Sequence, residues 1–338
     1  MRAVVFEKFG NPSEVLQVKE IPEPKPGPGE VLVRMHASPI NPSDLLTVHG
    51  MYGRLPKLPA VPGFEGVGTV EAAGPGLYGK YLVGKRVAVL NGVTGNWCDK
   101  TVVTARQAVP LGRDLPLEQA AMFFVNPATA YLMTREVLEV PKGEWLLQTA
   151  ANSAVGHMVI RLGREFGFRT INVVRRAEQV DQLKELGGDQ AIHFDPREHP
   201  PEKLRDQVKG IVGERASLKY AIDAVGGATG TAAFNAVGNH GRMLVYGALS
   251  DEPIEASPRT LVTHSSTVEG FWLARWMMEA GVLEKLKLVK RISKLMRAGI
   301  LVSEISATFP LEAIRDAVDA VGTPGRRGKV LFQISPEA

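Results

Sequence analysis

The most constraining segment of the chain is residues 145–176, which read WLLQTAANSAVGHMVIRLGREFGFRTINVVRR. The segment contains a short apolar stretch, a turn of small residues, an amphipathic stretch at helical spacing, and a second apolar stretch that ends in two arginines. A helix that starts directly after such a turn presents unpaired N–H groups and the positive end of its dipole. Phosphate groups bind at helix starts of this kind. The segment therefore predicts a βαβ unit whose first turn holds a phosphate.

The turn and the arginines together indicate which nucleotide is bound. No side chain in the turn is large, so the backbone can approach a pyrophosphate. The turn residues expected at the cofactor are Asn152, Ser153, Ala154, Val155 and Gly156. Where an NAD-binding chain usually places an acidic group on the ribose 2′-hydroxyl, this chain has Arg175 and Arg176. Because a guanidinium binds a 2′-phosphate through paired charge-assisted hydrogen bonds, the sequence predicts NADPH.

Composition places the chain among ordinary globular proteins. Its 338 residues, 44% of them hydrophobic, are enough for two domains with a core each. No stretch approaches the roughly 18 uninterrupted apolar residues of a membrane helix, and MRAVVFEKFG resembles a first strand, so we expect a cytoplasmic protein without a membrane partner. A net charge of +4 is too mild to indicate nucleic-acid binding. The single cysteine, Cys98, excludes an internal disulfide and a multi-cysteine zinc lobe.

The first 120 or so residues predict a small β-rich domain. Turn signals separate short β-like stretches, which read AVVFE, EVLVRMHA, GVGTVEAA, KRVAVL and DKTVVTA. The segment IPEPKPGPGE at residues 21–30 has four prolines, so it cannot be helical. We expect it to be a rigid connector between two strands, with a proline-rich binding segment as the alternative.

From Leu117 onward the pattern changes to helical spacing, and strands and helices then alternate. This rhythm predicts a parallel sheet with helices on both faces. After it come a helical stretch at 271–298, the segment FPLEAIRDAVDAVG, and a closing strand, KVLFQI. Because this tail is too small for a third domain, we expect it to complete the N-terminal one. The predicted fold class is α/β, with a β-rich catalytic domain at 1–125 and 268–338 and a doubly wound Rossmann NADPH-binding domain at 126–267.

This arrangement resembles the medium-chain dehydrogenase/reductase superfamily over nearly the whole chain, which implies a GroES-like fold for the β-rich domain. Zinc alcohol dehydrogenases of that superfamily have a cysteine in the segment that reads SPINPSDL here, and a His-Glu pair in the segment that reads PGFEGVG. This chain has Asn41 and Phe64 at those points. Without the thiolate and the imidazole we expect no bound metal. A zinc-free reductase needs an acceptor that takes hydride without a strong Lewis acid, such as a quinone or a carbon–carbon double bond conjugated to a carbonyl.

Two subfamilies fit this requirement. The segments FFVNPATAY, QTAANSAVG, INVVRR and GFWLARW look like the 2-enoyl thioester reductases of the mitochondrial and bacterial fatty-acid type. Quinone oxidoreductases normally have A-x-x-G-x-x-G in the nucleotide turn, whereas Asn152 and Ser153 follow the enoyl reductases. The expected activity is therefore NADPH-dependent reduction of trans-2-enoyl thioesters of coenzyme A or acyl carrier protein. A zinc-independent NADPH:quinone oxidoreductase is the alternative, and a nucleotide-binding module without turnover is a third interpretation.

Tyr52 is the catalytic candidate, because HGMYGRLP matches the Tyr-Gly segment that the enoyl reductases place against the substrate carbonyl. A phenol with an ordinary pKa near 10 is protonated at neutral pH. It can donate a hydrogen bond to the thioester oxygen while negative charge develops there, and then supply the α-carbon proton. The alternative role for Tyr52 is simple packing in a Gly- and Pro-rich loop.

The remaining site residues are implied by the resemblance. Asn126 is a good N-cap on sequence grounds, with Pro127 at the first helical position, and the resemblance adds a contact to the nicotinamide. Further cofactor contacts are implied for Tyr246, Gly247, Ala248 and Leu249 after the strand GRMLVYG, for Phe271, Trp272 and Leu273 at the domain junction, and for Lys329 near the cofactor phosphates. The resemblance also implies a homodimer.

Overall fold

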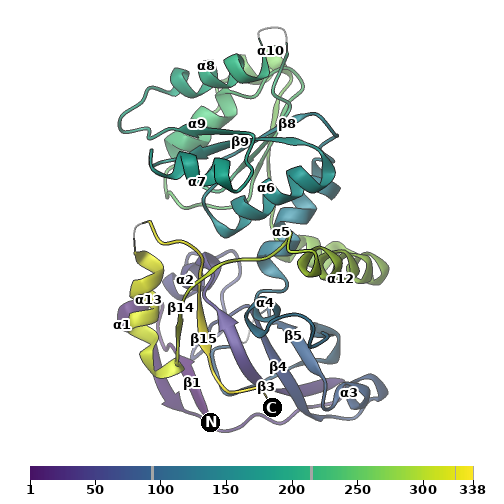
Figure 1. Ribbon diagram of the computed structural model, residues 1–338. Coiled ribbons are helices and arrows are strands. Elements are labelled where there is room, and N and C mark those ends of the chain that lie inside the picture. The colour runs from purple at the N-terminus through teal and green to yellow at the C-terminus, as the bar shows by residue number, and fades with distance from the viewer. Residues whose placement is uncertain (93–94, 214–215, 324, 338) are drawn as a thin grey trace. The chain divides into compact units, whose positions relative to one another are not determined.

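The computed structural model describes residues 1–92, 95–213, 216–323 and 325–337, which form two compact units (Figure 1). Unit 1 comprises Met1–Asn126 and Val302–Ala338, and unit 2 comprises Pro127–Leu301. The first junction lies one residue from the expected boundary. The second lies well after residue 267, because strand β13 (Thr267–Gly270) is hydrogen-bonded to strand β12 (Arg242–Val245) of unit 2.

Unit 1 is built on an antiparallel framework with one parallel pair. Its larger sheet has the order β14-β15-β3-β4-β5-β7, with β6 added on β3, and β1 pairs with β2. The strands are β1 (Arg2–Val5), β2 (Gln17–Glu20), β3 (Glu30–Pro39), β4 (Glu65–Ala73), β5 (Arg86–Leu90), β6 (Lys100–Thr104), β7 (Ala108–Pro110), β14 (Ile305–Phe309) and β15 (Lys329–Gln333). The expected strands of this domain are confirmed, and the proline-rich segment does connect two strands, β2 and β3. The C-terminal strand β15 pairs with β3, so the tail completes this unit as expected.

The helices of unit 1 are short. They are α1 (Pro12–Val15), α2 (Pro42–His49), α3 (Leu77–Leu82), α4 (Leu117–Ala121) and α13 (Ile314–Gly322). Helix α2 follows Asn41, whose N–H donates to Asp44 Oδ2 at 2.7 Å, and it ends at Gly50 in the left-handed region with φ of 81°. The loop that carries Tyr52 starts directly after this glycine. Helix α5 (Val125–Leu132) begins at the last two residues of unit 1.

Unit 2 contains a parallel sheet with the order β10-β9-β8-β11-β12-β13. Besides β12 and β13, its strands are β8 (Trp145–Gln148), β9 (Arg169–Val174), β10 (Gln190–His193) and β11 (Tyr220–Asp223). Its helices after α5 are α6 (Ala154–Phe166), α7 (Gln179–Glu185), α8 (Pro201–Val212), α9 (Gly227–Asn235), α10 (Pro258–His264), α11 (Leu273–Glu279) and α12 (Val282–Arg297). The helix expected at 271–298 is therefore broken near Gly281.

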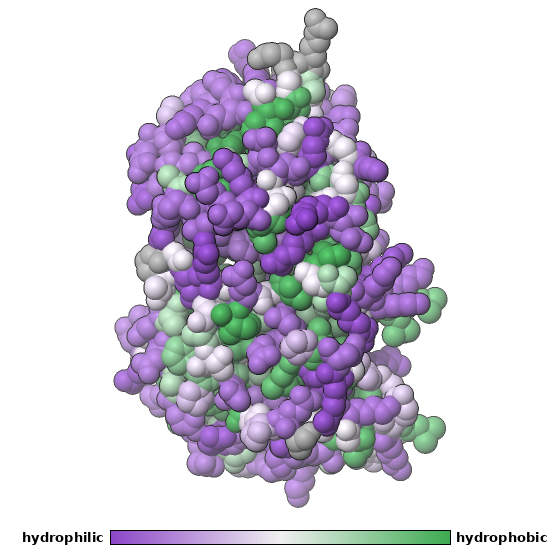
Figure 2. All heavy atoms as spheres, viewed as in Figure 1, coloured by the Kyte–Doolittle hydropathy of each residue, from purple (hydrophilic) through white to green (hydrophobic). Residues whose placement is uncertain are grey.

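Two separate apolar clusters cover the two faces of this parallel sheet. One joins Ile171 and Val173 to buried residues of α8 and α9, and the other joins Val174 to buried residues of α6 and α7. Helices on both faces confirm the doubly wound architecture, in which ligands bind at the carboxyl ends of the strands. Most of the surface in view is hydrophilic, with apolar residues in scattered groups (Figure 2). Among the described residues, no helix combines the length and the apolar character that a bilayer crossing requires.

Candidate active site

The predicted phosphate turn lies between β8 and α6. Ala150 adopts a left-handed conformation with φ of 47°, and Ser153 then caps α6, its Oγ accepting the Gly156 N–H at 3.1 Å. A Cβ added to Gly156 would lie 2.2 Å from the Ala151 carbonyl oxygen. The helix therefore packs on the turn so closely that only glycine fits, which is one reason that nucleotide-binding turns contain glycine. The strand, turn, helix and strand predicted for this segment are confirmed.

A hydrogen-bonded network connects the carboxyl ends of three neighbouring strands. Thr149, after β8, donates from Oγ1 to Asp223 Oδ1 at 2.5 Å, and Asp223 also accepts the Gly226 N–H at 2.8 Å. Tyr246, after β12, donates its N–H to the Asp223 carbonyl at 2.9 Å, and its side chain is hydrogen-bonded to Ser153. Burial and the Asp223 charge raise the pKa of Tyr246, so its phenol stays neutral. Two predicted site residues, Ser153 and Tyr246, are thus brought together.

The segments that follow β12 and β13 also lie at this edge of the sheet. A Cβ on Gly247 would approach the Ala224 carbonyl oxygen to 2.7 Å, so glycine is needed there for packing. Ala248 and Leu249 are exposed, as residues that border a ligand would be. The aromatic segment after β13 is half-buried rather than part of the core. It consists of Phe271, Trp272 and Leu273.

Arg175 and Arg176 lie directly after β9, at the same edge of the sheet. Arg175 is exposed and Arg176 is half-buried. Within the described part of the chain, neither guanidinium has an acidic partner within ion-pair distance. Asp195 lies near enough for its charge to act on Arg175, and the binding of an anionic ligand by the two arginines stays a prediction.

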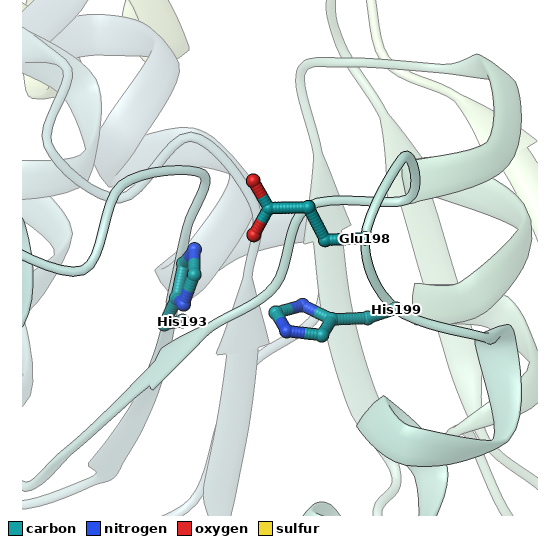
Figure 3. Close-up of side chains that lie close together, drawn as sticks. All are labelled: His193, Glu198 and His199. Carbon is teal, nitrogen blue, oxygen red and sulfur yellow. The ribbon is translucent and has the colours of Figure 1, made fainter.

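A group of possible metal ligands lies beside Arg175, at the last residue of β10 and on the loop that follows it. Figure 3 shows the Glu198 carboxylate next to the rings of His193 and His199, and their ligand atoms lie within 4.8 Å of one another. His193 Nε2 contacts the Arg175 carbonyl at 3.1 Å, and His199 Nδ1 accepts the Asp195 N–H at 3.2 Å. Each neutral ring therefore carries its proton on Nε2, which leaves His193 Nδ1 as the one imidazole lone pair available to a metal. This geometry does not favour a metal site.

Three predicted site residues lie in unit 1: Tyr52, Lys329 and also Asn126, which we expected in the Rossmann domain. Tyr52 is half-buried, and its ring packs on that of Phe64 with the centroids 5.2 Å apart. Asn126 is 8% exposed and lies inside the first turn of α5, which begins one residue earlier, at Val125. The prediction that Asn126 is the N-cap is therefore wrong. The N–H groups of Phe124 and Val125 donate to Glu65 Oε2 instead, at 3.0 and 2.9 Å.

Lys329 belongs to a buried polar cluster of unit 1. Its Nζ donates to the Ile40 carbonyl at 3.0 Å and to Asn41 Oδ1 at 2.5 Å. Asp44 and Glu65 complete the cluster, and burial raises the pKa of both carboxyls while their hydrogen bonds and the Lys329 ammonium oppose that shift. Burial also lowers the pKa of Lys329, against the attraction of the two carboxylates. Because its ammonium already has these partners, we assign Lys329 to this cluster rather than to the cofactor phosphates.

Sequence reasoning considered Phe64 but missed Glu65 beside it. The signal was an acidic residue at the start of the otherwise apolar strand EGVGTV. The single cysteine, Cys98, is 2% exposed, and burial raises the pKa of its thiol to about 12. At neutral pH it remains a thiol and packs as a small apolar residue.

Comparison with known families finds two matching models. One, described as an alcohol dehydrogenase GroES-like domain, matches residues 27–113, and the other, described as a zinc-binding dehydrogenase, matches residues 154–288. The first lies in unit 1 and the second in unit 2. The GroES-like and Rossmann parts of the predicted fold are thereby confirmed.

Named relatives align with nearly the whole chain. Mitochondrial enoyl-[acyl-carrier-protein] reductase of Rattus norvegicus is 33% identical over 96% of this chain and 86% of its own length, and the Homo sapiens protein is 32% identical over the same shares. Among solved structures, a putative NADPH:quinone reductase from Bacillus thuringiensis is 30% identical, covers 99% of both chains and has a TM-score of 0.91. The complex of Etr1p with NADP and crotonyl-CoA is 27% identical, covers 98% of this chain and 99% of its own, and has a TM-score of 0.81.

The zinc in the name of the second model does not fit the residues of this chain. Phe64 offers no donor atom, and the side chain of Asn41 is used by Lys329 at Oδ1 and by Glu65 at Nδ2. The Lys329 ammonium, held next to the carboxyl groups of Asp44 and Glu65, would also repel a divalent cation. The cluster therefore lacks the nitrogen and sulfur ligands that a catalytic zinc requires.

Proposed function

This chain belongs to the medium-chain dehydrogenase/reductase superfamily, and from that premise we propose that it is an NADPH-dependent reductase of trans-2-enoyl thioesters. The observation that carries the proposal is the pair formed by Tyr52 and Phe64. Phe64 stands where the zinc-dependent relatives have a histidine ligand, and its ring supports a phenol. The acid available to a substrate carbonyl is thus a hydroxyl group and not a metal ion. The relatives named as reductases favour an enzyme over a binding module without turnover.

NADPH is the cofactor that the residues of unit 2 fit. The turn closed by Ser153 and Gly156 would hold the pyrophosphate at the start of α6, and Arg175 and Arg176 would hold the 2′-phosphate. The solved complex of Etr1p contains NADP, which supports the same choice. When bound, the reduced nicotinamide supplies the hydride that the β-carbon of the acyl chain accepts.

In the proposed reaction, Tyr52 donates a hydrogen bond to the thioester carbonyl oxygen. This bond strengthens as hydride arrives at the β-carbon, because negative charge then collects on that oxygen. The Phe64 ring restricts the orientation of the phenol, and the loop after Gly50 presents it. Tyr52 is also the candidate donor of the proton that the α-carbon takes up. Asn126, in the first turn of α5, is the proposed contact of the nicotinamide.

Reduction of quinones is the second candidate function. Its support is the putative NADPH:quinone reductase from Bacillus thuringiensis, which covers 99% of this chain with a TM-score of 0.91. Two observations favour thioesters over quinones: the curated relatives, named enoyl reductases, and the turn, in which Asn152 and Ser153 replace the pattern normal for quinone oxidoreductases.

The decisive comparison is between the two substrate classes. With NADPH, we expect kcat/KM for crotonyl-, hexenoyl- and decenoyl-CoA to exceed that for each member of a quinone panel by at least tenfold. Both rates can be measured from the loss of NADPH absorbance, with formation of the saturated acyl-CoA verified by chromatography. Quinones reduced with the higher kcat/KM, or NADPH loss without any saturated thioester, would reject the proposal.

We further propose a homodimer in the cytoplasm, as expected from the sequence. The edge strand β13 supports the dimer, because all four of its residues are exposed and its outer backbone edge has no neighbouring strand among the described residues. Pairing with a second copy would cover such an edge. The location remains a prediction, and the curated relatives are named mitochondrial proteins.

A further inference from the structure

Unit 1 buries a hydrogen-bonded cluster of four polar side chains that have no part in the proposed chemistry. Asn41 and Asp44 are 1% exposed, Glu65 is 2% exposed and Lys329 is 5% exposed. Removing two carboxyl groups and an ammonium from water costs several kcal/mol per ion unless each is well hydrogen-bonded. Hydrogen bonds of this cluster reach the main chain of Phe64, whose ring packs on Tyr52, and the main chain of Val125, which precedes Asn126.

Asp44 connects the cluster to Tyr52 by way of Phe64. Its Oδ2 accepts the Asn41 N–H at 2.7 Å, and its Oδ1 accepts the Phe64 N–H at 2.8 Å. Phe64 is thereby fixed at its main chain, and its ring packs on the Tyr52 ring at a centroid distance of 5.2 Å and an angle of 42°. A change at Asp44 would thus shift the surface on which the phenol rests.

Glu65 connects the cluster to Asn126 by way of the start of α5. Its Oε2 accepts the N–H groups of Phe124 and Val125, at 3.0 and 2.9 Å. A carboxylate at this point satisfies N–H groups at the helix start and interacts favourably with the helix dipole. Since Asn126 is the next residue, the position of its side chain depends on this anchor.

Asn41 and Lys329 join the two carboxyl groups into one network. The Asn41 amide donates from Nδ2 to Glu65 Oε1 at 3.0 Å and accepts at Oδ1 from the Lys329 ammonium at 2.5 Å. The ammonium attracts both Asp44 and Glu65. Lys329 begins the C-terminal strand β15, so the network is complete only when the tail has docked on the N-terminal part of the chain.

We propose that Asp44 and Glu65 are positioning residues for the reduction, Asp44 orienting Tyr52 through Phe64 and Glu65 orienting Asn126 through the first turn of α5. This inference rests on the proposed function, because it assumes the roles of Tyr52 and Asn126 given there. The two carboxyl groups then act on different steps. Asp44 acts on the chemistry at the substrate carbonyl, and Glu65 acts on the binding of the nicotinamide.

Double-mutant cycles test the two paths separately. Asp44→Asn should lower kcat for crotonyl-CoA about tenfold in the wild-type background and less than twofold in the Tyr52→Phe background, with the Kd of NADPH unchanged. Glu65→Gln should raise the Kd of NADPH about tenfold in the wild-type background and less than twofold in the Asn126→Ala background, while the full rise persists with Tyr52→Phe. The Kd values come from calorimetry or cofactor fluorescence.

Matched controls separate positioning from loss of stability. Asp99→Asn and Glu71→Gln neutralise carboxylates of the same unit that pair with Arg2 and with Arg34. Both should leave kcat and Kd within twofold, even if the thermal midpoint falls. Should Asp44→Asn not fold, Phe64→Leu keeps the main-chain bonds and should give the same loss of kcat, again absent with Tyr52→Phe. Should Glu65→Gln not fold, Asn41→Ser removes the amide that donates to Glu65 and should raise the Kd of NADPH by a smaller factor.

Additive effects in these cycles would overturn the inference, because residues that act through Tyr52 and Asn126 cannot add to the loss of those side chains. Equal effects of the cluster variants and the controls would also overturn it. A wild-type protein that does not reduce crotonyl-CoA would instead refute the proposed function. In that case the Asn126 cycle on NADPH binding still decides the role of Glu65.

Discussion

Substituting Tyr52 with phenylalanine is expected to lower kcat for crotonyl-CoA by about 100- to 1000-fold, the effect typical of removing one oxyanion donor. The substitution removes the hydroxyl and keeps the ring, so the packing on Phe64 at 5.2 Å is preserved. The Kd of NADPH should not change, because the proposed partner of the phenol is the substrate carbonyl and not the cofactor. Steady-state kinetics together with calorimetric titration of NADPH measure both quantities.

The control for this experiment is Tyr78→Phe, which removes the hydroxyl of an exposed tyrosine on α3 of the same unit. It should leave kcat within twofold of the wild-type value. If Tyr52→Phe also keeps kcat within twofold of the wild-type value, the phenol does not stabilise the transition state. Tyr52 would then only pack in its loop.

Replacing Arg175 and Arg176 together with alanine is expected to reduce kcat/KM for NADPH roughly 100-fold or more. Each hydrogen bond to a charged group contributes roughly 1.5–3 kcal/mol, and a tenfold change in affinity corresponds to about 1.4 kcal/mol. The value of kcat/KM for NADH should change less than about threefold, because NADH lacks the 2′-phosphate. Kinetics with each cofactor at saturating crotonyl-CoA give the selectivity ratio.

A double substitution of Arg205 and Lys209 on α8 removes two other cations of unit 2 and serves as the control. The ratio of its kcat/KM for NADPH to its kcat/KM for NADH should equal that of the wild-type protein. If kcat/KM falls by the same factor for NADPH and for NADH in the Arg175/Arg176 variant, the arginines support the fold of the turn and do not select the 2′-phosphate.

The sequence predicted well those features that local spacing determines. The strand, the turn and the helix around the phosphate site follow from the size of the side chains and from the spacing of the apolar residues. The close approach of Gly156 to Ala151 explains why a glycine is needed there. The break near Gly281 was missed, because apolar spacing resumes on its far side. Element boundaries at such places depend on caps and tertiary contacts more than on period.

The buried cluster could not be predicted from local pattern. Glu65 bonds to Phe124 across 59 residues, and Lys329 bonds to Asn41 across 288 residues. A lysine near the C-terminus ordinarily suggests a solvated or phosphate-binding group, since burial of lysine is rare without partners. Only the folded chain supplies the amide, the carbonyl and the two carboxyl groups that make its burial tolerable.

Transfer of deuterium from labelled cofactor tests the central claim most directly. NADPH carrying deuterium at C4, in the R or the S position, would be reacted with crotonyl-CoA, and the butyryl-CoA product analysed by mass spectrometry and NMR. The account predicts that one of the two labelled cofactors delivers a single deuterium to C3, and that the same reaction in D2O with unlabelled NADPH places deuterium at C2. Absence of deuterium at C3 with both labelled cofactors would contradict it.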